Sequence, residues 1–218
     1  MAHILITGGA GFIGTGLTAL ALGQGHRVRV LDNLSPQIHA SPEELRVQEG
    51  AQFIRGDVTV RSDIERALEG VDTVVHLAAE TGTGQSMYEI DRYYRVNVQG
   101  TALLFDVLAN SSHSVRNILL GSSRSVYGEG AYLCRNCEAQ GARRFPGPRT
   151  LKQLQAHQWT SPCPKCGGII EATATREDDP LAPASIYAAT KLAQEELVCV
   201  ACQSLAIPHA ILRFQNVY

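Results

Sequence analysis

The sequence predicts an α/β protein organised around a doubly wound parallel sheet. Two observations indicate this class: short runs rich in Ile, Val and Leu alternate with longer stretches of helical period, and a glycine-rich turn follows the first run. One segment interrupts this alternation: residues 130–174 show neither period, and four of the six cysteines lie there. We therefore expect one domain over residues 1–218 that contains an insertion with its own small fold.

Six short apolar runs predict the strands, and their composition is that of strands buried on both faces of a sheet. They cover residues 3–7, 27–32, 52–55, 73–77, 117–120 and 210–214. Four stretches repeat apolar residues at spacings of three and four, which predicts helices. These cover residues 12–22, 62–68, 93–108 and 186–205. The alternation of strand and helix predicts parallel strands joined by crossover connections.

The overall composition excludes several classes of protein. A hydrophobic share of 44% with 18% charged residues is typical of a folded globular chain. The formal net charge of −2 leaves no electrostatic footprint for nucleic acid or for an anionic membrane surface. No run approaches the roughly 20 apolar residues of a membrane-spanning helix. No basic segment precedes the first apolar run, as a signal peptide requires. We expect a soluble cytoplasmic protein.

A glycine-rich turn joins the first predicted strand to the first predicted helix. It reads GGAGFIG and places Gly8, Gly11 and Gly14 three residues apart. Such glycines let backbone amides approach a pyrophosphate at the positive end of the helix. The second strand ends at Asp32, whose carboxylate would accept hydrogen bonds from ribose hydroxyls and repel a 2'-phosphate. The context favours an NAD-binding Rossmann fold over a purely structural turn.

Asp57, directly after the third strand, has two interpretations. Its carboxylate could reach the adenine of the dinucleotide, or it could cap the following helix, with Ser62 or Asp63 nearby. The residues alone do not decide between them.

Two residues four apart on the last predicted helix point to proton chemistry. Tyr187 and Lys191 would lie on one face of this helix. A phenol titrates near 10, so a base active near neutral pH needs a nearby positive charge, which an ammonium and an oxidised nicotinamide would supply. On an arbitrary helix this pair is usually a solvated pair of side chains. Ser123, just past the fifth strand, strengthens the functional interpretation because it lies at the carboxyl edge of the sheet.

These elements, taken together, resemble the extended short-chain dehydrogenase/reductase family, in particular its nucleotide-sugar epimerases and dehydratases. The resemblance covers nearly the whole chain. The motifs that carry it are GGAGFIG, LDN at 31–33, GDV at 56–58, HLAA at 76–79, NVQGT at 97–101, SSRSVYG at 122–128, the Tyr-x-x-x-Lys pair and RFQNVY at 213–218.

The resemblance implies roles for individual residues. Tyr187 would be the acid and base, Lys191 would bind the nicotinamide ribose, and Ser123 would hydrogen-bond the reacting hydroxyl. Asn97 would help to fix the lysine through water, and Asn216 would approach the sugar nucleotide. The implied cofactor-binding set is Gly8, Gly11, Phe12, Ile13, Gly14, Asp32, Asn33, Asp57, Val58, Leu77, Ala78, Ala79, Asn97, Tyr187 and Lys191. The implied substrate-binding set is Thr81, Ser123, Arg124 and Asn216.

The loop after the fifth strand separates the reactions within this family. Similar dehydratases carry Thr-Asp-Glu where this chain has Ser123, Arg124 and Ser125, and eliminating water needs that additional acid and base. The details of this loop resemble 4-epimerases of deoxysugar nucleotides. The implied reaction is NAD-dependent inversion at C4 of a deoxysugar nucleotide, such as dTDP-L-rhamnose, or of a UDP-hexose. The alternatives are a reductase or dehydrogenase of the same family and a non-catalytic NAD-binding sensor.

The insertion contains two Cys-x-x-Cys pairs that predict one structural zinc site. The ligands would be Cys134, Cys137, Cys163 and Cys166. The 25 residues between the pairs exceed the usual spacing of 15 to 20, but CPKCGG has the form of a zinc knuckle. Four thiolates leave no open coordination position, so the metal would be structural. Free or redox-active thiols are the alternative. Cys199 and Cys202 lie at core positions of a predicted helix.

Several expectations concern partners. The family resemblance implies a nucleotide-sugar substrate and a homodimer formed through the helices around 93–108 and 186–205. It also implies a C-terminal substrate domain that these residues do not contain. Arg143, Arg144 and Arg149 raise the alternative that the insertion docks nucleic acid or a protein. Few aromatic residues accompany these arginines, so we expect neither nucleic acid nor a membrane as a partner.

Overall fold

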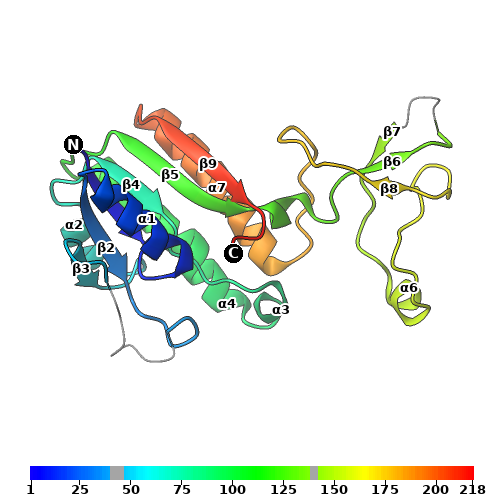
Figure 1. Cartoon of the computed structure of the whole chain (residues 1–218), viewed down its shortest axis with the longest axis horizontal. Helices are drawn as coiled ribbons and strands as arrows, with labels where there is room; N and C mark the ends of the chain where they lie inside the picture. Colours follow the sequence, from blue (N-terminus) through cyan, green and yellow to red (C-terminus); the bar gives the residue numbers. More distant parts are fainter. Residues whose placement is uncertain (40–46, 138–141) are drawn as a thin grey trace.

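The main body is a parallel sheet with helices on both faces (Figure 1). The computed structural model describes residues 1–39, 47–137 and 142–218. Within them the large sheet has the strand order β3-β2-β1-β4-β5-β9, and all its neighbouring strands are parallel. The strands are β1 (His3–Thr7), β2 (Arg27–Asp32), β3 (Gln52–Arg55), β4 (Thr73–His76), β5 (Asn117–Ser123) and β9 (His209–Phe214). The predicted α/β fold is therefore confirmed.

The alternation of side chains along β1 divides the core into two parts. Leu5 belongs to the larger apolar cluster, with Ile64, Leu104 and Val198, whereas its neighbour Ile6 belongs to a smaller cluster on the opposite face. The helices that supply these clusters are α1 (Phe12–Gly23), α2 (Arg61–Leu68), α5 (Gly100–Asn110) and α7 (Ile186–Ser204). Both faces of the sheet are covered, which explains the continuous apolar composition of its strands.

The order of the strands reverses between β1 and β4. From β1 the chain runs outward to β2 and β3 on one side, and from β4 it continues to β5 and β9 on the other. Ligands of doubly wound sheets bind at the carboxyl ends of the strands at such a reversal. The glycine-rich turn follows β1 at this position.

The helix predicted over residues 93–108 starts earlier and is not uniform. The chain forms α3 (Thr83–Ser86) and α4 (Ile90–Tyr93), followed by η2 (Tyr94–Gln99), a π-helical stretch that runs directly into α5. Asn97 is fully buried within η2. Single π-helical turns inside helices are frequent at functional sites.

The insertion lies outside the main sheet and extends away from it (Figure 1). It leaves the body after η3 (Arg124–Tyr127) and contains β6 (Tyr132–Cys134), β7 (Ala142–Arg144), α6 (Leu151–Gln155) and β8 (Glu171–Ala172). The three strands form an antiparallel sheet in the order β7-β6-β8. Residues 138–141, which the predicted insertion includes, lie outside the described residues.

The two ends of the insertion lie side by side where it joins the body. The Ala182 amide donates to the Val126 carbonyl at 2.9 Å, and the Thr173 amide donates to the Ala131 carbonyl at 3.0 Å. Gly128 has a φ of 64°, and a Cβ there would lie 2.2 Å from the Ala182 oxygen. The insertion is therefore attached through a narrow, closely packed pair of segments.

Among the described residues, the helices are all too short or too polar to cross a lipid bilayer.

Candidate active site

The glycine-rich turn brings three backbone segments into close contact. Gly8 has a φ of 67°, which favours glycine, and a Cβ on it would lie 2.7 Å from the Ala78 amide nitrogen. At Gly14 a Cβ would lie 2.5 Å from the Gly9 Cα. Helix α1 starts directly after Gly11, which precedes it in an extended conformation with no side-chain cap. The first amides of this helix are thus available to an anion.

A cleft of about 730 Å³ opens beside this turn. Its lining includes most of the residues predicted to bind the cofactor and two of those predicted to bind substrate. These are Gly8, Gly11, Phe12, Ile13, Gly14, Asp32, Asn33, Val58, Leu77, Ala78, Ala79, Thr81 and Asn216. Asp57, Asn97, Ser123, Arg124, Tyr187 and Lys191 do not line it. Most of the predicted dinucleotide residues therefore meet in one cavity, whereas Asp57, Asn97 and the predicted catalytic residues lie outside its lining.

Asp32 closes the end of the cleft beyond the glycine-rich turn. Its carboxylate accepts hydrogen bonds from the amides of Ala10 at 3.1 Å and Leu34 at 2.9 Å. The His39 ring nitrogen Nε2 lies 3.8 Å from the carboxylate and also lines the cleft. His39 was not among the predicted site residues, because a histidine in a polar loop carries no recognisable sequence pattern.

Asp57 is engaged by its own loop and not by a helix end. Its carboxylate accepts hydrogen bonds from the amide and hydroxyl of Thr59, at 2.8 and 2.7 Å, and from the Asn33 amide group at 2.9 Å. Burial opposes ionisation, and the hydrogen bonds from Asn33 and Thr59 more than compensate, so the pKa of Asp57 is lowered. The residue that precedes α2 is Val60, so the capping interpretation was wrong. Asp57 instead orients Asn33 at the edge of the cleft.

The Gly14→Ala variant is expected to weaken binding of the predicted dinucleotide about 10- to 100-fold. The added methyl group must displace the Gly8–Gly9 backbone, and such overpacking costs about 1–3 kcal/mol. Gly16→Ala is a matched control, because nothing lies within 4 Å of the new Cβ in the same helix. Calorimetric titration with NAD checks both variants. Equal affinities for Gly14→Ala and the unmodified chain would contradict the assignment of the turn.

The first turn of α7 positions Tyr187. Ser185 precedes the helix and accepts a hydrogen bond from the Ala188 amide, while the Tyr187 amide donates to the Ser86 hydroxyl at 3.0 Å. The Tyr187 ring meets the Tyr93 ring edge to face, with centroids 6.4 Å apart. Burial raises the pKa of the Tyr187 phenol, and a hydrogen bond with the Ser123 side chain opposes this shift. Ser123 is the last residue of β5, so the predicted pair meets at the carboxyl edge of the sheet.

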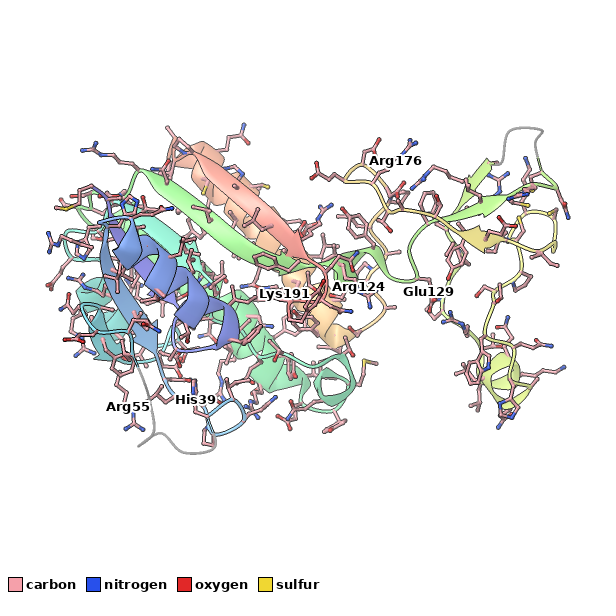
Figure 2. All side chains as sticks on the ribbon, in the orientation of Figure 1. His39, Arg55, Arg124, Glu129, Arg176 and Lys191 are labelled. Atoms are coloured by element: carbon pink, nitrogen blue, oxygen red, sulfur yellow. The ribbon has the colours of Figure 1, made fainter. Side chains whose placement is uncertain are left out.

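Lys191 lies one turn further along α7 and is almost completely buried, with 3% of its surface exposed. Burial lowers the pKa of its ammonium group to about 8, and the Glu195 carboxylate opposes this shift. Figure 2 labels Lys191 in the body, Arg124 where β5 leads into the insertion, and Glu129 further out along that segment. The charge of Lys191 also acts on His76, whose pKa is lowered to about 3, mainly by burial.

A buried layer of hydrogen bonds connects α7 to the sheet through η2 and α5. The Asn97 amide group donates to the Thr190 hydroxyl at 2.9 Å, and its oxygen accepts from the Glu80 amide at 2.7 Å. Thr101 donates to the Asn97 carbonyl at 2.6 Å, and its oxygen lies 2.9 Å from His76 Nε2. Asn97 therefore contacts Thr190, the residue that precedes Lys191. The buried, neutral His76 is a structural member of this layer, with its two ring nitrogens at Thr7 and Thr101.

Arg124 and Thr81 do not join the Tyr187–Ser123 pair directly. Both are exposed, as is Asn216 at the cleft. Ser125, two residues after Ser123, donates its amide to the Ser123 hydroxyl at 3.2 Å. The loop thus presents hydroxyl groups and one arginine near Tyr187, and residues 123–125 provide no carboxylate.

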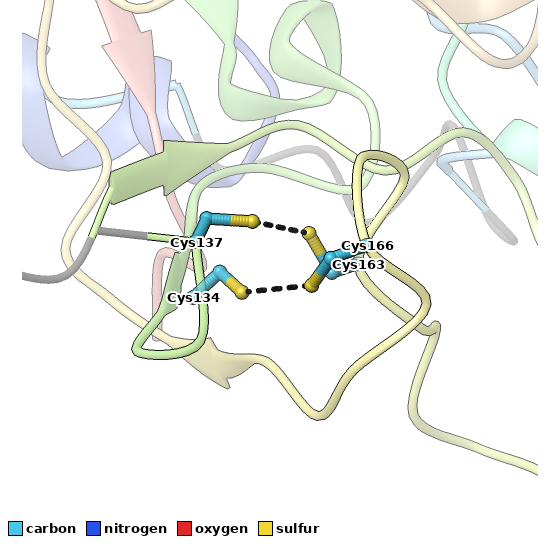
Figure 3. A group of neighbouring side chains, drawn as sticks. All are labelled: Cys134, Cys137, Cys163 and Cys166. Carbon is cyan, nitrogen blue, oxygen red and sulfur yellow. Dashed lines mark hydrogen bonds between the residues drawn. The ribbon is translucent and has the colours of Figure 1, made fainter.

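The four predicted metal ligands converge in the insertion (Figure 3). Their sulfur atoms all lie within 4.8 Å of one another, with Cys134–Cys166 and Cys137–Cys163 at 3.6 Å. Tetrahedral zinc with bonds of about 2.3 Å requires sulfurs about 3.8 Å apart, so this arrangement fits the ion. Burial would raise the pKa of the Cys163 thiol, but hydrogen bonds from the Cys166 and Lys165 amides lower it to about 6. Cys134, Cys163 and Ile170 also form the small core of the insertion.

The arginines of the insertion have acceptors within the chain. Arg143 pairs with Asp179, and Arg149 donates to both carboxylate oxygens of Glu129 at 2.8 and 2.9 Å. Arg144 lies against the sulfur atoms of Cys137 and Cys163, which raise the pKa of its guanidinium. Each of these three arginines therefore has a partner within the chain.

Comparisons with known proteins agree with this geometry. Residues 4–218 match the NAD dependent epimerase/dehydratase family. The chain is 41% identical over 218 residues to dTDP-L-rhamnose 4-epimerase from Burkholderia thailandensis, covering 99% of this chain and 58% of that protein. It is 37% identical over 134 residues to UDP-glucose 4-epimerase from Neisseria meningitidis, covering 59% of this chain and 39% of that protein.

A solved structure of UDP-glucuronic acid 4-epimerase from Bacillus cereus, in complex with UDP-glucuronic acid and NAD, superposes with a TM-score of 0.72 at 26% identity. This match covers 99% of our chain and 57% of the other. The chain thus spans little more than half the length of these full-chain matches. The chain belongs to the NAD dependent epimerase/dehydratase family.

Proposed function

We propose that this chain is the dinucleotide-binding and catalytic part of an NAD-dependent nucleotide-sugar 4-epimerase. One arrangement carries the proposal: the Ser123 side chain at the carboxyl edge of the sheet acts on the partly buried Tyr187 phenol and opposes the rise of its pKa, with buried Lys191 one turn further along α7. Its place on the same sheet edge as the glycine-lined cleft supports the pairing of this acid and base with a nicotinamide cofactor.

The residues of the cleft fit NAD. A Cβ on Gly8 or Gly14 would collide with neighbouring backbone, so these glycines allow the tight turn that lines the cleft. The start of α1 offers its first amides to a pyrophosphate, and the Asp32 carboxylate suits ribose hydroxyls. When bound, NAD would accept the hydride from C4 of the sugar and return it to the opposite face. Lys191 would donate hydrogen bonds to the nicotinamide ribose.

Tyr187 would move the proton of the sugar 4-hydroxyl. The phenol takes this proton as C4 is oxidised and returns it to the same oxygen when C4 is reduced, so the residue ends each cycle unchanged. Because burial raises the pKa of the phenol in the chain alone, the base form requires positive charge in the cleft. Ser123 would orient the reacting oxygen. The remaining contribution to the rate would come from placing C4 of the sugar against the nicotinamide.

The substrate proposed is a deoxysugar nucleotide of the dTDP-L-rhamnose type, with UDP-hexoses as the second class. The match to the dTDP-L-rhamnose 4-epimerase covers 99% of the chain and so includes the insertion. The UDP-glucose 4-epimerase match covers only 59%. Ser123, Arg124 and Ser125 include no carboxylic acid for dehydration, which favours epimerisation over elimination.

The test is a panel of nucleotide sugars incubated with the full-length protein, with inversion at C4 followed by NMR. We expect inversion of dTDP-linked deoxysugars and no net consumption of NAD. Stoichiometric NADH release without inversion would favour the dehydrogenase alternative, and NAD binding without turnover of any sugar would favour the sensor.

The affinity for NAD is expected to fall as the pH rises through 8. Lys191 loses its proton above its pKa of about 8, so an increasing share of the chain lacks the ammonium donor. If only the charged form binds, the dissociation constant rises by at most about 30-fold between pH 7 and 9.5. Titration calorimetry across this range checks the slope, with circular dichroism to confirm folding. A Lys191→Met variant should show weak binding without this slope, and an unmodified chain with a flat profile would contradict the role of Lys191.

Further parts of the proposal concern the insertion and the assembly. Residues 130–174 would form a separate unit around one structural zinc held by the four cysteines. A homodimer through α4, η2, α5 and α7 is supported by exposed apolar side chains on that side, including Tyr88, Ile90, Tyr94 and Val200. We place the protein in the cytoplasm, where reduced thiolates would hold zinc.

A further inference from the structure

One buried charged residue of α7 has no role in the mechanism described so far. Glu195 lies on α7 four residues after Lys191, and only 5% of its surface is exposed. Residues four apart on a helix share one face, so the Glu195 and Lys191 side chains leave α7 on the same buried face, and the Glu195 carboxylate acts on the Lys191 ammonium. A carboxylate is almost never this buried unless it is paired.

The partners of Glu195 come from the two strands that end beside Tyr187. Arg213 of β9 donates to both carboxylate oxygens, with Nη2 to Oε2 at 2.8 Å and Nε to Oε1 at 3.1 Å. The hydroxyl of Ser122 on β5 donates to Oε1 at 2.5 Å, and Ser122 directly precedes Ser123. The carboxylate is therefore fixed by adjacent strands at the same sheet edge as the catalytic pair.

Arg213 also binds the segments from which the insertion emerges. Its Nη1 donates to the Tyr127 hydroxyl at 2.6 Å and to the Glu177 carbonyl at 3.1 Å. Its guanidinium lies over the Tyr127 ring, 4.9 Å from the centroid. One side chain thus holds the carboxylate of Glu195 and both ends of the insertion.

The surroundings of Lys191 contain few groups that could keep it charged. The charged and titratable groups that act on Lys191 or Glu195 are His76 from β4 and Arg213 from β9, and Arg213 also contacts the Tyr127 hydroxyl from η3. The Ser122 hydroxyl from β5, which binds the Glu195 carboxylate, does not titrate in this range. His76 is neutral, so Glu195 is the anion acting on Lys191 among the residues that the structure describes. A buried ammonium without an anion readily loses its proton.

We propose that Glu195, held in place by Arg213 and Ser122, is a positioning residue that keeps the buried Lys191 ammonium charged at the pH where the site works. The positive guanidinium of Arg213 partly offsets the negative charge of the Glu195 carboxylate, and so weakens the effect of that carboxylate on Lys191. The effect of Glu195 on the charge of Lys191 does not depend on the proposed function. Only its consequence, that a charged Lys191 binds the nicotinamide ribose, rests on that function.

Direct titration of the lysine side chains by NMR tests the proposal without any assay of activity. The chain has three lysines, so the ε-methylene signals of a sample with labelled lysine are few, and Lys191→Met assigns the buried one. Glu195→Gln is expected to raise the proton dissociation constant of Lys191 at least about threefold, while Glu195→Asp retains most of the wild-type value. Arg213→Gln should move the titration in the opposite direction, because the carboxylate then acts unshared.

The matched control is Glu196→Gln. Glu196 is the adjacent residue but is exposed on the other side of α7, so removing its charge should leave the Lys191 titration unchanged. General damage to the helix would not give opposite shifts in the Glu195→Gln and Arg213→Gln variants.

Binding of NAD gives the second readout. Glu195→Gln should bind as the unmodified chain does at pH 6.5 and several-fold more weakly at pH 8.5, where its lysine has lost more of its protons. Identical Lys191 titrations in the unmodified and Glu195→Gln proteins would overturn the proposal. If Glu195→Gln does not fold, unchanged titration in Arg213→Gln would overturn it equally. If Lys191 shifts as expected but no sugar nucleotide is inverted, the proposed function fails and the present inference stands.

Discussion

The Tyr187→Phe variant is expected to lose C4 inversion by a factor of about 10²–10⁴ while still binding NAD. The substitution removes one hydroxyl group, which takes and returns the proton of the sugar 4-hydroxyl, and general acid–base groups typically contribute this factor. The ring itself is retained, so its contact with Tyr93 and the first turn of α7 should persist. Inversion is measured by NMR in the full-length protein, and NAD binding by calorimetry.

Tyr94→Phe is a suitable control for the loss of a phenol. Tyr94 lies on η2 with 42% of its surface exposed, so the loss of its hydroxyl should leave turnover unchanged. Near-normal epimerisation by Tyr187→Phe would show that another group moves the proton, and the assignment of the acid and base would then be wrong.

The second large effect is expected at the cysteine cluster. The unmodified protein should contain one zinc per chain, and Cys163→Ser should retain almost none, because structural zinc sites of this kind contribute about 10–16 kcal/mol to folding in isolated peptides. Cys163 is buried in the small core of the insertion, which the sulfur atoms largely form. Loss of the metal should therefore unfold the insertion but leave the main body folded.

Two probes separate these regions. The single tryptophan, Trp159, lies in the insertion and reports on it by fluorescence, whereas the helices of the body dominate far-ultraviolet circular dichroism. Cys202 is buried as predicted, but Cys199 is exposed on α7, so its predicted core position was wrong. Cys199→Ser is therefore the control and should keep its zinc. A metal content well below one per chain in the unmodified protein would contradict the zinc proposal and favour free or redox-active thiols.

The sequence predicted the body of the fold because its two periodicities are clear. The run at residues 27–32 places Val28, Val30 and Leu31 among three charged residues, and the observed β2 has the predicted bounds. The π-helical stretch at Tyr94–Gln99 was not predictable, since one additional residue per turn scarcely changes a pattern of apolar residues. The strands of the insertion were not predictable, because each has only two or three residues and so shows no alternation of apolar and polar side chains. The fold of the insertion depends instead on cysteines that are distant in the sequence and converge in space.

The candidate site was predictable where glycine or a motif carries the chemistry. The glycine-rich turn and Asp32 needed only their positions beside two strands, and both line the cleft. Glu195 and Arg213 were not predictable, because a glutamate on a helix and an arginine on an edge strand usually face solvent. Their pairing depends on β9 lying beside β5, and no local pattern contains that information.

In the proposed reaction, the hydride that leaves C4 returns to C4 within the same site. This is tested most directly with a dTDP-linked deoxysugar that carries deuterium at C4, incubated with the full-length protein in ordinary water. We expect the deuterium to remain at C4 of the inverted product, because a hydride held in the site does not exchange with solvent. Inverted product that carries solvent hydrogen at C4 would contradict it.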